Sequence, residues 1–191
     1  MSAKILLVIL VFLSILLAGC DELETPAPTA VPTLVPTVSL EERLYEEEAF
    51  SFTIPAGWGM TTREGEYYDL GMQEKFTAHN APLITDSGAF FTLSTAPLAE
   101  GEDLESRIAS AYAVQMTGIE DLAQQPYERA GLSGYEATYR RPWGEPWWHF
   151  RDIWLEKDGT SYLLSFSSSP NSFDRNTEVF DAIIGSFHFN D

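Results

Sequence analysis

The sequence predicts an α+β fold with a mainly antiparallel sheet and two principal helices. Two runs rich in aromatic and apolar residues, 147–156 and 160–167, flank Asp158-Gly159, a pair that is typical of a tight β-hairpin turn. Two further segments, one in the middle of the chain and one near its end, carry apolar residues at helical spacing. Because hairpins join antiparallel neighbours, the two separated helices can cover one or both faces of such a sheet.

The first residues form a separate region. A positive charge at Lys4 precedes an apolar run, 5–17, that is shorter than the roughly 20 residues needed to cross a bilayer. The run ends in Leu17-Ala18-Gly19-Cys20, which resembles the lipobox of bacterial lipoproteins, where the cysteine is lipidated and becomes the N-terminus. We therefore predict a lipoprotein signal peptide over 1–19 and lipidation of Cys20. The alternative is an uncleaved anchor with a chance cysteine.

Cysteine content and charge exclude several classes of function. Cys20 is the only cysteine, so the mature chain has no disulfide, thiolate metal site or free cysteine nucleophile once that thiol is acylated. Asp and Glu number 29 against 11 Lys and Arg, which gives a net charge of −18. Because a protein that binds phosphates needs a basic face, nucleic acid is excluded as a partner. The acidity is typical of a solvated surface.

Residues 20–39 are predicted to form a tether after the lipidated cysteine. Pro-Thr recurs three times between residues 28 and 37, and such a segment has no apolar face to bury and favours an extended conformation. The remaining residues, 40–191, have the length of one domain, since domains commonly contain about 100–150 residues. We expect a single, monomeric globular domain.

The domain is predicted to open with a strand. Residues 40–48 form either a helical turn or an extended lead-in, and the lead-in is favoured. Phe50, Phe52 and Ile54 then alternate with polar residues, as in a half-buried strand that Pro55 ends. The motif Phe-x-Phe-x-Ile-Pro-x-Gly-Trp, placed after a lipobox and a linker, resembles the start of PsbP-like and Mog1-like domains.

This resemblance spans roughly residues 50–189. It implies an α/β/α sandwich, because PsbP-like and Mog1-like folds have helices on both faces of such a sheet. It also implies an accessory role in a membrane or envelope complex. Its motifs are mostly packing residues, so they predict the fold far better than an activity.

The middle of the chain fits the same scheme. Residues 72–78 and 89–96 are predicted strands. Asp103 is the expected N-cap of a helix whose apolar residues recur at helical spacing, and Gly118 is the expected residue beyond its end; these apolar residues are Leu104, Ile108, Ala111, Tyr112 and Met116. Residues 119–129 give no clear pattern, and 135–141 are predicted to resume a strand.

A second helix and a last strand are expected after the hairpin. Ser169 and Pro170 suit an N-cap and a first helical position. The predicted buried face contains Phe173, Thr177, Phe180 and Ile184. Gly185 is expected to end this helix before a strand over 186–189.

Candidate binding residues cluster around the start of the hairpin. Trp143, Trp147 and Trp148 lie beside Arg140, Arg141 and His149 in an otherwise acidic chain. Tryptophan and arginine are enriched at binding hot spots, and tryptophan can stack on sugars. The alternative is core packing. In a strand, Trp148, Phe150, Asp152 and Trp154 would share one face, and core packing is favoured for Trp154.

Neither a metal site nor a catalytic motif is found. His79, His149 and His188 are far apart in the sequence, and no metal-binding spacing surrounds them. Ser133 lies in Gly-Leu-Ser-Gly, which lacks the Gly-x-Ser-x-Gly pattern of a nucleophile elbow. A Ser-His-Asp set assembled from distant segments stays open.

The sequence thus predicts a protein on the extracytoplasmic face of a bacterial cell membrane, attached through lipidated Cys20. We expect a non-catalytic binding or accessory domain for a membrane or envelope complex, with no cofactor. Two alternatives stay open: a small-ligand or glycan binder that uses Trp143, Trp147 and Trp148, and a hydrolase with a dispersed triad.

Overall fold

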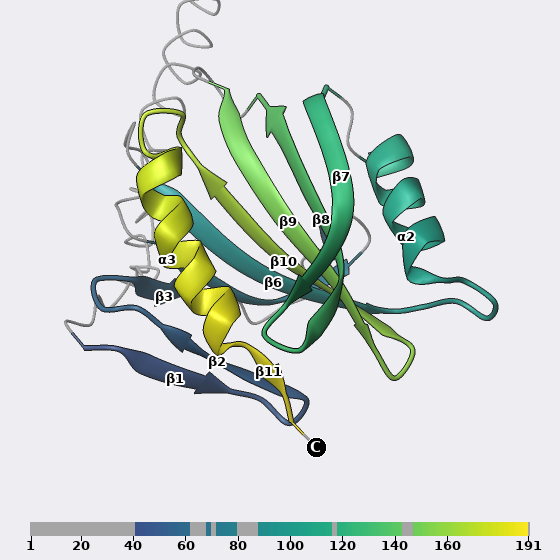
Figure 1. The fold of residues 1–191 in the computed structure, drawn as a ribbon, viewed down its shortest axis with the longest axis horizontal. Coiled ribbons are helices and arrows are strands. Elements are labelled where there is room, and N and C mark those ends of the chain that lie inside the picture. Colours follow the sequence, from purple (N-terminus) through teal and green to yellow (C-terminus); the bar gives the residue numbers. More distant parts are fainter. Residues whose placement is uncertain are drawn as a thin grey trace, which may run out of the picture. The chain divides into compact units, whose positions relative to one another are not determined.

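The computed structural model describes residues 41–61, 68–69, 72–79, 88–115, 118–142 and 147–190, which belong to one compact unit, Pro36–Asp191. They form two sheets, helix α2 (Leu104–Ser110), π-helix η1 (Ala111–Gln115) and helix α3 (Phe173–Ser186) (Figure 1). The strands are β1 (Arg43–Glu46), β2 (Phe50–Ile54), β3 (Gly59–Thr61), β4 (Tyr68–Asp69), β5 (Met72–His79), β6 (Ala89–Pro97), β7 (Glu120–Arg129), β8 (Leu132–Arg141), β9 (Trp148–Lys157), β10 (Thr160–Ser168) and β11 (His188–Phe189).

The larger sheet has the strand order β3-β5-β6-β10-β9-β8-β7, with β4 paired to β5, and the smaller sheet has the order β1-β2-β11. Every pair is antiparallel. The prediction of an α+β fold with an antiparallel sheet is therefore confirmed. Within the described part of the chain, no helix is both long and apolar enough to span a membrane.

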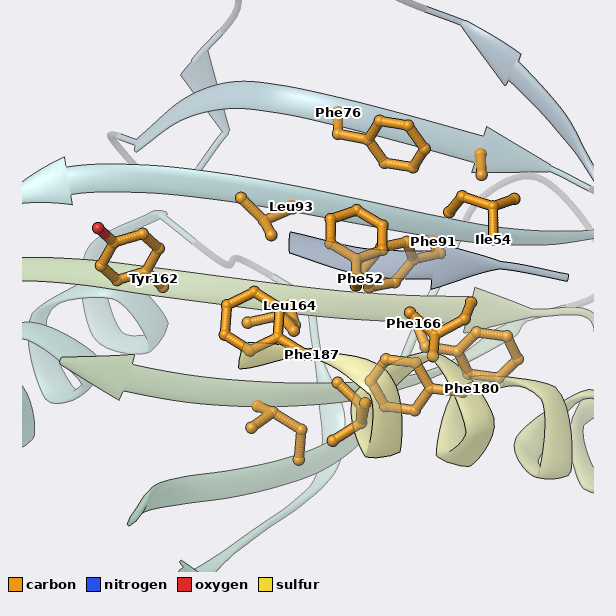
Figure 2. Close-up of a cluster of buried hydrophobic side chains, with 14 of the residues drawn as sticks. Phe52, Ile54, Phe76, Phe91, Leu93, Tyr162, Leu164, Phe166, Phe180 and Phe187 are labelled. Atoms are coloured by element: carbon orange, nitrogen blue, oxygen red, sulfur yellow. The ribbon is translucent and has the colours of Figure 1, made fainter. Parts of the chain in front are cut away.

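One face of the larger sheet, called here the α3 face, is covered by α3 and the smaller sheet. Phe52 of β2 contacts Phe76 and Phe91 edge to face, with ring centroids 5.2 and 5.4 Å apart, and Phe180 of α3 stacks on Phe166 at 5.1 Å (Figure 2). At the side of this core, Arg151 of β9 bonds to Glu136 of β8 and donates to Asp181 of α3 over 2.7 Å. Rings and this ion network together fix α3 on the sheet.

The opposite face, called the α2 face, packs against α2 and η1. Ile108, Ala111 and Tyr112 are buried there against Trp154 and Leu163 of the sheet. Because side chains alternate along a strand, Trp154 lies on this face while its neighbours Ile153 and Leu155 lie in the α3 core. Helices on both faces confirm the predicted α/β/α sandwich.

The predicted hairpin joins β9 and β10. Thr160 pairs with Lys157, and the two residues between them have positive φ, 52° at Asp158 and 73° at Gly159. These values match the type I′ turn that Asp-Gly favours, because both central residues of that turn need φ above zero. The extended lead-in is also found, since β1 pairs with β2 along its whole length.

Helix α2 begins as predicted but changes geometry. Asp103 is its N-cap, and the Asp103 side chain accepts a hydrogen bond of 2.8 Å from the backbone N–H of Ser106. After Ser110 the chain continues as a π-helix, in which the neighbouring residues Ala111 and Tyr112 are both buried. The predicted face residue Met116 lies outside the described residues, and Gly118 has the positive φ of 81° expected of a glycine beyond a helix.

The predicted limits of the last helix were wrong. Ser169 directly follows β10 and is held beside the start of β6, because its N–H donates to Gly88 O over 3.3 Å. A turn follows in which Ser172 N–H donates to Ser169 O over 3.0 Å. Ser172 is therefore the N-cap, and α3 begins at Phe173. Gly185 lies inside the helix, which ends when Phe187 turns to an extended conformation and enters the core; only His188 and Phe189 form the last strand.

The segment without a clear pattern, 119–129, contains β7 at the edge of the larger sheet. Within β7 only Tyr127 is buried, so no apolar alternation marks the strand in the sequence. Strand β8 likewise begins earlier than predicted, at Leu132.

Candidate functional site

Four of the six predicted binding residues lie on neighbouring ends of β8 and β9. Arg140 and Arg141 end β8, while Trp148 and His149 begin β9. Trp147 immediately precedes β9, and all five of these side chains are half-buried. Trp143 lies outside the described residues, as does the predicted lipidation site Cys20.

The structure divides these residues between the two faces of the sheet. Trp148 pairs with Arg141 and belongs to the α2 face, on which Phe150 and Trp154 also lie. Arg140 pairs with His149 on the α3 face, where the His149 ring lies 5.1 Å from the ring of Phe173. One cluster in the sequence is therefore two separate surfaces in the fold.

Arg140 is engaged by carboxylates of the edge strand. Its Nη2 atom lies 2.6 Å from Asp121 and 3.2 Å from Glu120. Both carboxylates are exposed and the Arg140 side chain is 40% exposed, so the pairs contribute little stability, about 0–1 kcal/mol each. These ion pairs neutralise Arg140.

On the α2 face, Trp148 forms part of an aromatic surface that the sequence alone did not reveal. The ring of Trp148 lies 5.6 Å from that of Phe90 on β6, although β10 runs between the two strands. The β10 residue opposite Phe90 is Ser167, which is small and buried. A short side chain at this position lets the two larger rings meet above it. Both rings are half-buried and thus reach the solvent.

Next to this pair lies a stacked pair that supports it. The rings of Tyr139 and Phe150 are nearly parallel, at 6°, with centroids 4.9 Å apart. Both are buried and belong to the core cluster that Trp148 packs against. Trp148 therefore rests on a rigid base while part of its surface is exposed.

Deeper on the same face lies a fully buried carboxylate, Asp152. The Tyr112 hydroxyl donates to Asp152 Oδ2 over 2.7 Å, and the Ser165 hydroxyl donates to Oδ1 over 2.6 Å. Tyr139 also hydrogen-bonds to this carboxylate. Trp154 Nε1 in turn donates to the Tyr112 oxygen over 3.0 Å, so a chain of donors leads to Asp152.

The protonation of the two tyrosines follows from this environment. Burial, and then the nearby charge of Asp152, raises the pKa of the Tyr112 hydroxyl above its ordinary value. The same two causes raise the pKa of Tyr139. Both hydroxyls therefore keep their protons and stay donors to the carboxylate. Because Tyr112 lies in η1 and Asp152 in β9, this network fixes the π-helix on the sheet.

Sequence reasoning placed Asp152 correctly beside Trp154 and Phe150 but assigned it no role. Its partners Tyr112 and Ser165 are 40 and 13 positions away in the chain. The available signal was an acidic residue within an apolar strand, since a buried charge requires partners.

The surroundings of the histidines test the alternative that the protein is a hydrolase with a dispersed Ser-His-Asp triad. Ser51 Oγ lies 2.8 Å from His188 Nε2, while the other ring nitrogen of His188 lies 3.1 Å from the carbonyl oxygen of Ser186. Ser51 is only 3% exposed, and its hydroxyl also donates to Asn190 Oδ1 over 3.1 Å. A nucleophile must reach its substrate, and Ser51 lacks that access. The contact instead joins β2 to the C-terminal strand.

His149 contacts an aromatic ring, and the side chain of His79 lies outside the described residues. Across the described ranges, no three His, Cys, Asp or Glu side chains gather in a way that could hold a metal ion.

Comparison with known proteins identifies the fold. No protein-family model and no curated protein matches the sequence. Among solved structures, the chain is similar to the cyanobacterial PsbP protein CyanoP from Synechocystis sp. PCC 6803, with a TM-score of 0.57 at 16% identity over 86% of this chain and 100% of that one. The domain therefore has a PsbP-like fold, as the sequence predicted.

A second similar structure is LpqN, which is involved in cell envelope biogenesis of Mycobacterium tuberculosis. Its TM-score is 0.54 at 7% identity, over 78% of this chain and 91% of LpqN. At these identities the likeness establishes the fold alone.

Proposed function

We propose that this chain is a lipid-anchored extracytoplasmic protein whose PsbP-like domain binds a component of a membrane or envelope complex without catalysing a reaction. The observation that carries the proposal is the fold. It is similar to CyanoP over the whole of CyanoP and 86% of this chain, and it is also similar to LpqN, a protein involved in cell envelope biogenesis. The lipobox-like sequence ending in Cys20 supplies the expected anchor. A tether over 20–39 would hold the domain away from the bilayer.

The surface that best suits such binding is the end of the α2 face, around Trp148 and Arg141. Tryptophan and arginine contribute strongly to interfaces because each combines a large contact area with directional polar contacts. Here Trp148 stands on a rigid strand and packs on a buried aromatic cluster. Little conformational freedom would therefore be lost when a partner covers it.

Membrane attachment is tested by Cys20→Ala in the native host. The Cys20→Ala chain should leave the membrane fraction, because no lipid can be attached to it. A double variant that also carries Trp148→Ala should fractionate identically, because the domain surface takes no part in anchoring. Membrane retention of Cys20→Ala would contradict the predicted anchor and localisation.

Partner binding is tested by crosslinking the lipidated, full-length protein in its own membranes and identifying the captured proteins. Wild type should capture a membrane or envelope protein, and Trp148→Ala should lose that capture at equal abundance. Trp147→Ala is the matched control, since it removes the neighbouring ring. Identical capture by wild type and Trp148→Ala would contradict the assignment of this surface.

A further inference from the structure

Helix α2 and η1 cover only part of the α2 face. Their buried residues contact Trp154, Leu163, Ala96 and Met72. Toward the other end of the same strands, the face carries Phe90 and Thr92 on β6, Ser165 on β10 and Trp148 on β9, and all four side chains are partly exposed. Among the residues that the structure describes, no helix packs on this end of the face.

The exposed end contains two kinds of group in adjacent rows. The first row is aromatic, with the rings of Phe90 and Trp148 in contact above Ser167. The second row is built from hydroxyls. Thr77 pairs with Thr92, Thr92 with Ser165 and Ser165 with Asp152, so the row runs across β5, β6, β10 and β9. We call Phe90, Trp148, Thr77, Thr92 and Ser165 the aromatic–hydroxyl surface.

The hydrogen bonds within the second row determine which hydrogen-bond donors and acceptors this row can present to a ligand. The Ser165 hydroxyl gives its hydrogen to Asp152, so its oxygen lone pairs are directed to accept. Thr77 Oγ1 and Thr92 Oγ1 lie 3.4 Å apart, close enough for one of them to donate to the other. The row thus holds hydroxyl oxygens in fixed positions, and Asp152 keeps Ser165 in one orientation.

We propose that the aromatic–hydroxyl surface binds a sugar ring of a neutral glycan. A pyranose has a face of C–H groups, which can stack on an aromatic ring, and an edge of hydroxyls, which both donate and accept hydrogen bonds. On this surface an aromatic row lies directly beside a hydroxyl row, so one ring can use both. The net charge of −18 repels polyanionic ligands and favours a neutral one.

This inference rests on the proposed function, because it assumes a domain that acts by binding. It specifies a ligand class and places recognition on Trp148 with Phe90, Thr92 and Ser165. Trp147 is not part of the surface, although it is adjacent to Trp148 in the sequence.

The test is calorimetric titration of the full-length chain in a detergent without a sugar headgroup. The probes are maltose, cellobiose and N,N′-diacetylchitobiose, with glycerol as a polyol that has no ring face. At least one disaccharide should bind at millimolar or lower concentration and glycerol should not.

Trp148→Ala should weaken binding about tenfold or more, as loss of a hot-spot ring does. Thr92→Val, which keeps the shape and removes the hydroxyl, should weaken it a few-fold.

Trp147→Ala is the matched control and should bind the disaccharide as wild type does. Circular dichroism and thermal melting of each variant establish that a loss of binding is not a loss of folding. Absence of binding by all three disaccharides, or equal weakening by Trp147→Ala and Trp148→Ala, would overturn the inference. If no sugar binds but membrane-protein capture still depends on Trp148, the glycan inference fails alone and the proposed function stands.

Discussion

The two faces of the larger sheet are built from different chemistry. The α3 face is filled by phenylalanine and aliphatic side chains from the sheet, α3 and the smaller sheet, with its ion network at one side. The α2 face combines aromatic rings with hydroxyls and a fully buried carboxylate, and only α2 and η1 pack on it among the described helices. One face of the sheet thus carries an apolar core with ion pairs at its side, and the other carries a smaller hydrophobic cluster that includes buried polar groups and has a partly exposed end.

This difference indicates how stability and recognition are divided in the domain. Apolar burial is non-directional and roughly proportional to area, so the α3 face contributes most of the free energy of folding. Buried hydrogen bonds contribute less net free energy but fix geometry. The α2 face is therefore suited to hold the exposed rings and hydroxyls in defined positions.

The largest effect is expected from truncating the α3 core. Phe180 is fully buried and contacts the rings of Phe91 and Phe166. Phe180→Ala should lower the free energy of unfolding by about 3–5 kcal/mol, measured by chemical denaturation. The half-buried Phe173→Ala in the same helix should cost clearly less. If Phe180→Ala leaves stability unchanged, the assignment of this face as the main core is wrong.

A smaller effect is expected on the α2 face. Asp152→Asn keeps the size of the side chain but exchanges an acceptor for a donor, so a buried hydroxyl must reorient or lose its bond. The cost should be about 1–3 kcal/mol. Tyr112→Phe removes the hydroxyl that reaches the same carboxylate. Because the two residues share one network, their effects should not add in a double variant. Additive effects would show that the network does not act as a unit.

Alkaline pH should test the Tyr112–Asp152 network of the α2 face. The pKa values of Tyr112 and Tyr139 are raised in the folded chain, mainly by burial and then by Asp152. A raised folded-state pKa means that the unfolded chain loses these protons first. Stability from this source is therefore fully present below about pH 10 and falls as pH rises above that value. Melting temperature measured against pH should show this fall, and Tyr112→Phe should make it less steep. An equal slope in both proteins would contradict the assignment.

The smallest effect is expected outside both faces. Gly185 lies in α3, and a Cβ added there meets no atom within 4 Å. Gly185→Ala should stabilise the protein by about 0.4–1 kcal/mol, because alanine restricts the unfolded chain. Gly134→Ala is the contrasting variant, since a Cβ at Gly134 would overlap the main-chain carbonyl of Trp154. Thermal melting should therefore rise for the first and drop sharply for the second; the same sign for both would contradict this packing.

Local sequence patterns predicted most of the fold. The Asp158-Gly159 turn, the strand over Phe50–Ile54 and the Asp103 cap each depend on residues close together in the chain, and each is found in the structure, although Ser51 of that strand is buried as well. Two kinds of element escaped prediction. The edge strand β7 buries only Tyr127, so no alternation marks it. The start of α3 depends on the hydrogen bond from Ser169 N–H to Gly88 O, which is a tertiary contact.

The candidate site could be predicted only in part. The sequence identified Trp148 and Arg141 but grouped them with Arg140 and His149, which lie on the other face because adjacent strand residues point in opposite directions. Phe90 and Ser165 were not predicted as site residues. They come to lie beside Trp148 and Asp152 only because β6 pairs with β10 and β10 pairs with β9. Such register is not encoded in any single segment.

The central claim is that the exposed end of the α2 face serves binding while the buried residues of this face serve stability. Comparing Trp148→Ala with Trp154→Ala tests this claim most directly. Both variants remove a tryptophan from the same face of β9, one half-buried and one fully buried. Trp154→Ala should cost about 3–5 kcal/mol of stability. Trp148→Ala should melt close to wild type and lose capture of the membrane partner. If Trp148→Ala lowers the melting temperature as much as Trp154→Ala does, the exposed end is core packing and the claim is contradicted.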